Sequence, residues 1–540
     1  MATVDYIIIG AGSAGCLLAN RLSANKKHQV ILLEAGGRDK NPNIHIPAAF
    51  SKLFKAKEDW NYSTVPQKYM NGRQMFQPRG KVLGGSSSTN AMIYIRGHRY
   101  DYDQWAKLGN KGWSYEEVLP YFKSFEHNTR LKDEFHGQKG ELNVTDQPWR
   151  HPFGKRLLDA AKAAGYDWNE DFNGAAQEGF GYYQVTQKEG RRHSGAAAFL
   201  SPVLHRSNLN VEINALVHKI IVENGEAKAV LFEQNGTVRT IHAQKEVILC
   251  AGAFGSPHLL MLSGIGHEAE LRQHGIKVEH HLPGVGKNLQ DHLIGGMAIS
   301  THDKTTLDGV ERFPQVFKNL WQYFVNKGGP LSSNVAELGG FLKSDPAIPA
   351  PDLQFLFAAA YFVEHGFQNP KTGNGYSFGP TLIAPFSKGE VRLASKNPHD
   401  YIAIDPNYFS DERDVQVMLK GSHIVQKILD QAPFDRVRGK TFMPNKEIQN
   451  DDEMAYFLRQ YCETLYHPVG TCKMGSDDQA VVDEQLRVHG VRKLRVVDAS
   501  IMPIIIRGNT NAPTMMIAEK ASSMILQQSS KSTQTIRQEA

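Results

Sequence analysis

The residues with the clearest chemical meaning form a glycine-rich run near the start of the chain, Gly10-Ala11-Gly12-Ser13-Ala14-Gly15. In such a run the first glycine permits a tight turn and the second lets the backbone approach a pyrophosphate. The third lets a helix pack close to the preceding strand. The free N–H groups and the positive dipole at the start of that helix then face the phosphates. The run therefore predicts a loop that binds a dinucleotide.

An acidic residue follows this loop at a suitable distance for ribose binding. Glu34 lies nineteen residues after Gly15, where a carboxylate accepts hydrogen bonds from the ribose of an adenosine. The same carboxylate would repel a 2′-phosphate, which counts against NADP. The pattern leaves both FAD and NAD open.

A βαβ unit is needed to position these residues. Short apolar runs predict buried parallel strands at 5–9 and 29–33, and the proline-free pattern between them predicts a helix at 13–24. Apolar and alternating segments at 211–222 and 229–250 predict hairpins and a return to this unit.

One segment has the length of a membrane span but not its character. Residues 247–266 contain no Asp, Glu, Lys or Arg, and twenty residues are enough to cross a bilayer. Four glycines and Pro257 within the segment would break a helix that faces lipid. We therefore expect a buried strand, a loop and a short helix there, and no transmembrane segment.

Composition and charge exclude several classes of protein. The 540 residues are 41% hydrophobic and 22% charged, as in a soluble protein of several domain-sized parts. The net charge of +5 is spread along the chain, so it gives no argument for nucleic-acid binding. The four cysteines have neither CxxC nor zinc-site spacing, so we predict no metal site and favour the reducing cytoplasm.

Further motifs carry a resemblance to a known family. They are Gly80-Lys81-Val82-Leu83-Gly84-Gly85-Ser86-Ser87-Ser88-Thr89-Asn90-Ala91-Met92-Ile93, Gly252-Ala253-Phe254-Gly255-Ser256-Pro257, Val496-Val497-Asp498-Ala499-Ser500 and Asn509-Thr510-Asn511-Ala512-Pro513-Thr514. With the first glycine-rich run, they resemble the signatures of the glucose–methanol–choline (GMC) family of FAD-dependent oxidoreductases over nearly the whole chain. The branches that it most resembles are the bacterial medium-chain alcohol dehydrogenases and the choline dehydrogenases.

The resemblance implies an α/β fold with two interleaved domains. A Rossmann-like FAD-binding domain would be assembled from residues 1–160, 195–296 and 466–530. A substrate domain built on an antiparallel sheet would take 297–465, with parts of 161–194. The polar tail at 531–540 is expected to fray.

The resemblance also implies which residues hold the cofactor. Besides the first loop and Glu34, these are Val82, Gly84, Asn90, Ala91, Met92, Ile93, Val217, Asp498 and Ala499. Pro513 would begin a helix whose N-terminus stabilises negative charge on the flavin. Some relatives bind FAD covalently through a histidine whose place is taken here by Thr89, so we expect non-covalent FAD.

Two residues are expected to act on the substrate. His467, in Tyr466-His467-Pro468-Val469-Gly470-Thr471, resembles the base of the family, and histidine suits that role because its ordinary pKa is near neutral. Asn511 matches a second family position that orients the substrate oxygen, although an asparagine there also suits a helix cap.

We expect oxidation of primary aliphatic alcohols to aldehydes, with hydride transfer to flavin N5. Trp60, Glu337 and Tyr466 match positions that enclose a trimethylammonium group in choline-oxidising relatives, so choline is the second candidate substrate. A hydroxynitrile lyase, which would keep FAD without net redox chemistry, is a third.

The segment 313–324 bears on the electron acceptor. Its apolar residues recur at helical spacing, with Lys318 and Lys327 nearby. The plain interpretation is a helix packed on the substrate domain. The alternative is a peripheral contact with the inner membrane that brings the flavin near a quinone acceptor.

Overall fold

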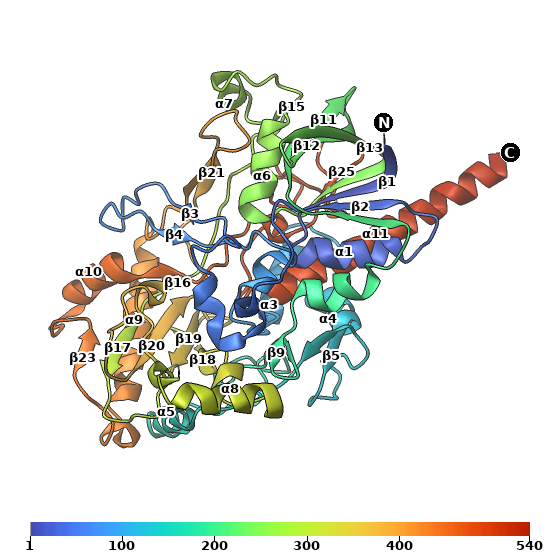
Figure 1. Cartoon of the computed structure of the whole chain (residues 1–540). Coiled ribbons are helices and arrows are strands. Elements are labelled where there is room, and N and C mark those ends of the chain that lie inside the picture. Colours follow the sequence, from blue (N-terminus) through green and yellow to red (C-terminus); the bar gives the residue numbers. More distant parts are fainter. Residues whose placement is uncertain (1, 311, 540) are drawn as a thin grey trace.

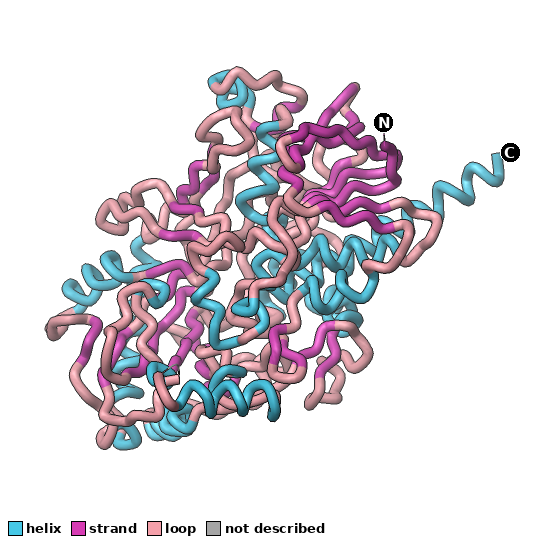
Figure 2. Tube along the Cα trace, in the orientation of Figure 1, coloured by secondary structure: helices cyan, strands magenta, loops and turns pink. Residues whose placement is uncertain are grey.

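The structure is a computed structural model that describes residues 2–310 and 312–539, without the side chains of Ala2 and of 529–539. Two sheets organise the chain, one at the upper right of Figure 1 and one at the lower left. Helices and long loops surround both sheets, as Figure 2 shows by colour.

The first sheet contains the expected βαβ unit. Its strands follow the order β10 (Leu209–Glu212), β2 (Val30–Leu33), β1 (Ala2–Ile9), β13 (Thr237–Leu249), β12 (Glu226–Gln234) and β11 (Ala215–Glu223), and β25 (Leu494–Val496) also pairs with β13. β1 is parallel to β2 and to β13, and α1 (Ser13–Ser23) connects β1 to β2. The strand, helix and strand expected from the sequence are confirmed, and their ends differ from the expected ones by at most three residues.

The hairpins of this sheet form as the turn residues require. Asn224 and Gly225 join β11 to β12, and Asn235 and Gly236 join β12 to β13; all four have positive φ angles, between 51° and 74°. Asparagine and glycine tolerate this conformation, which matches the twist of the strands in a two-residue hairpin turn. The segment 247–266 forms the end of β13, then α6 (Gly252–Leu262) and β14 (Ile265–Gly266).

The second sheet is antiparallel throughout, as expected for the substrate domain. Its order is β23 (Thr441–Met443), β17 (Met297–Ser300), β20 (Gly375–Leu382), β19 (Leu353–Ala358), β18 (Leu338–Leu342) and β7 (Gly179–Tyr182), while β16 (Leu293–Ile294) pairs with β20 and with β24 (Glu463–Thr464). The helices packed around it are α5 (Pro152–Ala163), α9 (Glu412–Leu429) and α10 (Asp451–Tyr461). α5 and β16, which the predicted boundaries assign to the FAD-binding domain, lie with this second sheet.

The remaining elements are short, apart from the last helix. They are α2 (Pro42–His45), α3 (Arg99–Lys107), α4 (Tyr115–Phe125), α7 (Glu268–Gln273), α8 (Gln315–Asn326), β3 (Tyr62–Ser63), β4 (Phe76–Gln77), β5 (Glu126–Asn128), β6 (Leu142–Val144), β8 (Gln187–Lys188), β9 (Arg191–Arg192), β15 (His280–His281), β21 (Glu390–Arg392), β22 (Ala403–Asp405) and α11 (Asn511–Glu539). The start of α11 packs against α1, and its far end extends beyond the body of the molecule in Figure 1. The tail expected to fray lies beyond the residues whose side chains are described.

Hydrophobic residues form two main cores, one for each sheet. The larger core surrounds β1, β2, β13 and α1, and the smaller one lies between the second sheet and α5, α9 and α10. Within the described residues, no helix is both long and apolar enough to span a bilayer.

Candidate active site

A large cavity is lined by residues from both sheets. The glycine-rich loop after β1, the end of β2 and the start of α6 line its nucleotide end. Strands β17, β19 and β20 and the loop before β18 line its other end. A cofactor held by the first domain therefore meets a substrate held by the second.

The glycine-rich loop has the room that a diphosphate needs. A Cβ atom on Gly10 would lie 2.5 Å from the carbonyl oxygen of Cys250, and one on Gly15 would lie 1.9 Å from the carbonyl oxygen of Gly10. These two glycines allow the strand and the helix to pack closely. A Cβ on Gly12 would have its nearest neighbour 4.0 Å away, and Gly12 precedes the uncapped start of α1, so a dinucleotide fits here.

Glu34 lies in the expected place for contact with a ribose. It is buried, it lines the cavity, and its two carboxylate oxygens accept hydrogen bonds from the N–H groups of Ala11 and Gly36, each at 2.8 Å. Burial raises the pKa of this carboxyl to about 7. A ribose hydroxyl that donates to it would favour the ionised form.

The other predicted cofactor residues divide into two groups. Ser13, Ala14, Asn90, Ala91, Met92, Ile93, Val217, Asp498 and Ala499 line the cavity with Gly10, Gly12 and Glu34. Gly15, Val82, Gly84 and Pro513 do not line it. Gly84 instead has a φ of +91° and donates its N–H to the carbonyl of Ala11 at 2.7 Å, which holds the second loop against the first. None of these four residues faces the cavity.

Two buried residues that the sequence analysis passed over hold this region together. Arg192 donates to the side-chain oxygen of Asn90 at 2.7 Å, and burial without a carboxylate partner lowers the pKa of its guanidinium to about 9. Ser256 donates to Asp498 at 2.5 Å, and Asp498 also accepts from the N–H of Gly252 at 2.9 Å. Arg192 lies in none of the quoted motifs, and Ser256 lies in the motif that starts at Gly252 but was not singled out there.

His467 lines the cavity and is almost fully buried. Its backbone N–H donates a hydrogen bond to Oδ1 of Asp291 at 2.8 Å. Its ring nitrogen Nδ1 lies 3.0 Å from Nδ1 of His292, and its Nε2 lies 3.3 Å from the amide nitrogen of Asn509. Burial, followed by the neighbouring His292 and Arg79, holds the pKa of His467 well below its usual 6.5.

These contacts define one tautomer of the ring. The Asn509 amide donates, so Nε2 of His467 must carry a lone pair and the ring hydrogen lies on Nδ1. That hydrogen is donated to His292, which is a neutral acceptor because burial lowers its pKa to about 3. The histidine is therefore uncharged, with the basic nitrogen next to the Asn509 amide.

The hydrogen-bond partner of His467 is Asn509, whereas the sequence analysis named Asn511 as the residue that orients the substrate oxygen. The side-chain oxygen of Asn511 accepts a hydrogen bond from Ser13 at 2.7 Å, which joins the start of α11 to the glycine-rich loop. Asn511 lines the cavity, but the hydrogen-bond partner of His467 is Asn509. The motif contains both asparagines, and only the path of the backbone before α11 decides which of them faces the histidine.

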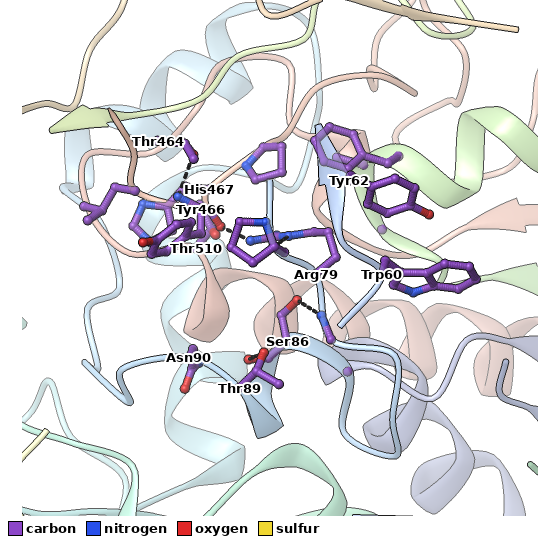
Figure 3. A pocket seen from close by; sticks show the side chains of 18 of the residues that line it. Trp60, Tyr62, Arg79, Ser86, Thr89, Asn90, Thr464, Tyr466, His467 and Thr510 are labelled. Carbon is purple, nitrogen blue, oxygen red and sulfur yellow. Dashed lines mark hydrogen bonds between the residues drawn. The ribbon is translucent and has the colours of Figure 1, made fainter. Parts of the chain in front are cut away.

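The three predicted substrate residues do not form one enclosure. Figure 3 shows Tyr466 and His467 on one side of the cavity and Trp60 with Tyr62 on the other. Trp60 stacks on Tyr62 with ring centroids 5.7 Å apart. Glu337 is buried and does not line the cavity; its oxygens accept from Ser333 at 2.6 Å and from the N–H of His151 at 2.7 Å.

Tyr466 is fixed by a chain of polar side chains. Its hydroxyl lies 2.6 Å from Nδ1 of His365, and Nε2 of His365 lies 2.9 Å from a carboxylate oxygen of Glu463. Arg73 forms an ion pair with the other oxygen of Glu463. The carboxylate nearest to Tyr466 is therefore already paired with a cation.

The wall on the substrate side is mainly apolar. The residues from this side include Phe50, Phe54, Ile294, Met297, Ala298, Val335, Ala336, Leu356, Phe357, Phe362, Phe378 and Leu465. A dinucleotide loop that opens onto an apolar chamber with a neutral buried histidine defines a redox enzyme that acts on a small organic substrate. A dinucleotide bound at one end would accept electrons, and a neutral histidine has the chemistry to take up a proton.

Comparison with known proteins agrees with this class. The N-terminal model of the GMC oxidoreductases matches residues 4–294 and the C-terminal model matches residues 385–518. The chain is 46% identical over 527 residues to an alcohol dehydrogenase [acceptor] of Pseudomonas putida, covering 97% of this chain and 95% of that one. It is 42% identical to the mitochondrial choline dehydrogenase of Mus musculus, covering 96% and 89%.

Solved structures show the same fold. A pyridoxine 4-oxidase from Mesorbium loti superposes with a TM-score of 0.88 at 31% identity, covering 96% of this chain and 98% of that one. A variant of formate oxidase from Aspergillus oryzae gives a TM-score of 0.92 at 29% identity, covering 97% and 98%. The chain belongs to the GMC oxidoreductase family, and FAD is its cofactor. The resemblance, the fold class and the cofactor expected from the sequence are thereby confirmed.

Proposed function

We propose that this protein oxidises primary aliphatic alcohols to aldehydes. The observation that carries the proposal is the neutral, buried His467, whose basic Nε2 lies beside the Asn509 amide in the cavity shared by both domains. An alcohol needs a base for its hydroxyl proton and a donor for its oxygen, and these two side chains supply them.

FAD supplies the acceptor for the hydride that leaves the alcohol carbon. The glycine-rich loop and Glu34 would hold its adenosine diphosphate part, and Asn90 to Ile93 with Asp498 and Ala499 would lie along the rest. Thr89 lines the cavity, and its hydroxyl is a much weaker nucleophile than the imidazole of a histidine, which supports non-covalent binding. The electrons then pass to a quinone or another acceptor, and a quinone takes up two electrons and two protons to become a quinol.

His467 would take the hydroxyl proton at Nε2, and the Asn509 amide would donate to the oxygen as its negative charge grows. An amide suits this task because it donates a hydrogen bond without competing for the proton. His467 is buried and Asn509 is partly buried, so water is limited at the reacting carbon and the hydrogen bond from Asn509 stabilises the charge more than it would in water.

The apolar wall favours an alkyl chain over a quaternary ammonium. Trp60 lies across the cavity from Tyr466, Glu337 faces away from it, and Glu463 is paired with Arg73. Neither Glu337 nor Glu463 therefore offers a free carboxylate to a cation bound between Trp60 and Tyr466. Choline remains the second candidate because relatives named choline dehydrogenase share 42% of the residues over nearly the whole chain.

The test is a substrate series on the purified holoenzyme. 1-Butanol, 1-octanol, 1-dodecanol and choline are compared at equal concentration with a soluble dye as electron acceptor, and the aldehyde is measured directly. We expect 1-octanol to be oxidised with a kcat/KM at least about tenfold above that of choline, the ratio given by 1.4 kcal/mol of preferential binding. Turnover of choline alone would overturn the aliphatic assignment, and dye reduction by no alcohol would overturn the proposed reaction.

A further inference from the structure

Helix α8 exposes a row of large apolar side chains. We call Phe313, Phe317, Trp321, Phe324 and Val325 the aromatic face; they are 81%, 63%, 60%, 62% and 59% exposed. Phe317, Trp321 and Phe324 follow one another at intervals of four and three, so they lie on one side of α8. Phe313 lies just before the helix, with its ring 6.0 Å from that of Phe317. The helix does pack on the protein, with Leu320 partly buried, but the residues of the aromatic face are exposed rather than packed on the substrate domain.

The opposite side of α8 holds the helix to the protein. Asn319 is buried and donates to the carbonyl of Val310 at 2.8 Å. Tyr323 is also buried, and its hydroxyl donates to the carbonyl of His45 at 3.1 Å. The helix is thus attached through polar anchors and a small cluster with Val310 and Leu331. The aromatic face points outward because the inner side is already occupied.

Within residues 312–336 every charged residue is basic, and Glu311 precedes this segment in the sequence. Arg312, Lys318 and Lys327 are exposed, and the sequence from 312 to 336 contains no Asp or Glu. Among the residues that the structure describes, neither Lys318 nor Lys327 takes part in an ion pair. Aromatic residues on one side of a helix and lysines on its flanks are typical of a helix that lies in the interface of an anionic bilayer.

A second copy of the chain is a poorer partner for this surface. In a two-fold symmetric contact, the same patch would face itself. Lys318 and Lys327 of each copy would then approach those of the other without an acidic residue from 312–336 to compensate. Anionic lipid headgroups provide the opposite charge, and the acyl chains below them accommodate the aromatic side chains.

The aromatic face is connected to the wall of the active-site cavity. Ile46 and Ala48 pack on the cluster that anchors α8. The 3₁₀ helix at Pro47–Leu53 then carries Phe50 into the cavity wall, with its ring 6.1 Å from that of Phe362, another wall residue. α8 lies at the lower edge of the molecule in Figure 1, on the side of the second sheet. A bilayer under α8 would lie next to the apolar end of the cavity.

We propose that the aromatic face and its flanking lysines bind the surface of an anionic bilayer. Apolar alcohols concentrate in such a bilayer, and this orientation would bring the substrate end of the cavity close to them. The part of the inference that concerns substrate supply rests on the proposed alcohol oxidation. The binding of lipid does not.

The experiment is flotation of the holoenzyme with vesicles of phosphatidylcholine and phosphatidylglycerol, without alcohol. The test variants are Trp321→Glu and Lys318→Glu. The matched control is Tyr456→Glu, because Tyr456 is 59% exposed on α10. We expect the fraction of protein that floats to agree within twofold between the wild type and the control. Trp321→Glu should partition into the vesicles at least tenfold less. The loss of binding in Lys318→Glu should grow as the phosphatidylglycerol content of the vesicles rises.

Three results would overturn the proposal. They are a wild type that stays at the bottom of the gradient, a Trp321→Glu variant that floats like the wild type, and a dimer in gel filtration that Trp321→Glu converts to a monomer. Oxidation of dissolved 1-octanol with a soluble dye distinguishes a failure of lipid binding from a failure of the proposed alcohol oxidation. We expect Trp321→Glu to keep this activity, whereas an enzyme that floats but oxidises no alcohol would leave lipid binding intact and refute the proposed function.

Discussion

Replacing Glu337 by glutamine tests whether this carboxylate is a buried structural group or a ligand for a cationic substrate. Glu337 is 1% exposed, and burial raises its pKa from 4.5 to about 7. Its two hydrogen-bond donors, Ser333 and the N–H of His151, do not compensate for the loss of water. Glutamine keeps the shape and one oxygen acceptor, and it carries no charge.

The size and the sign of the effect follow from the pKa. A carboxyl that titrates about 2.5 pH units higher in the folded state costs the folded protein about 3 kcal/mol when it is ionised, at about 1.4 kcal/mol per unit. The folded state binds the proton more tightly than the unfolded state, so the wild type gains stability as the pH falls from above 7 toward 4.5. Glu337→Gln has no such titration, so its stability relative to the wild type should rise with pH and reach a plateau above pH 7.

The assay is urea unfolding of the FAD-loaded protein at several pH values between 5 and 9, followed by far-ultraviolet circular dichroism. Glu134→Gln, at an exposed position, serves as the control. A Glu337→Gln variant whose stability difference from the wild type does not change with pH would refute the burial argument. A variant that unfolds normally but loses choline turnover alone would refute the placement of Glu337 outside the substrate site.

Three further predictions concern catalysis. His467→Ala should retain FAD but reduce it about 100- to 10,000-fold more slowly in stopped-flow measurements, because the alcohol loses its base; an unchanged rate would exclude His467 from this role. Asn509→Ala should slow the same step about 100- to 1,000-fold. Asn511→Ala should mainly weaken FAD binding, because the contact with Ser13 is lost. FAD titrations and rapid kinetics on both variants test this, and slower flavin reduction in Asn511→Ala but not in Asn509→Ala would favour Asn511 as the residue that orients the substrate. Because the pKa of His467 lies well below 6.5, the free-enzyme profile of kcat/KM should stay level from pH 9 down to pH 6.5, and a fall centred at or above pH 6.5 would contradict a neutral base.

Local sequence patterns determined much of the nucleotide-binding part. The loop from Gly10 to Gly15, the strands beside it and the Asn-Gly hairpin turns follow from short-range constraints on backbone conformation and close packing. These constraints act on neighbouring residues, so they are visible in one sequence. The antiparallel sheet of the second domain came instead from the family resemblance.

The sequence is less informative where residues that are distant along the chain decide the outcome. The choice between Asn509 and Asn511 depends on how the chain approaches α11, and both residues fit the motif equally well. Glu337 faces Ser333 and His151 rather than the cavity because of how β18 and α5 pack. The sequence left two orientations of α8 open because the period of an amphipathic helix does not show whether its apolar side faces a core or the surroundings.

The central claim is that an aliphatic alcohol delivers a hydride to the flavin in the site formed by His467 and Asn509. The most direct measurement mixes the yellow holoenzyme with 1-octanol or with choline in the absence of oxygen and follows the visible absorbance of the flavin. We predict rapid bleaching by 1-octanol and at most slow bleaching by choline. A flavin that stays oxidised with 1-octanol, or that is bleached by choline alone, would contradict the claim.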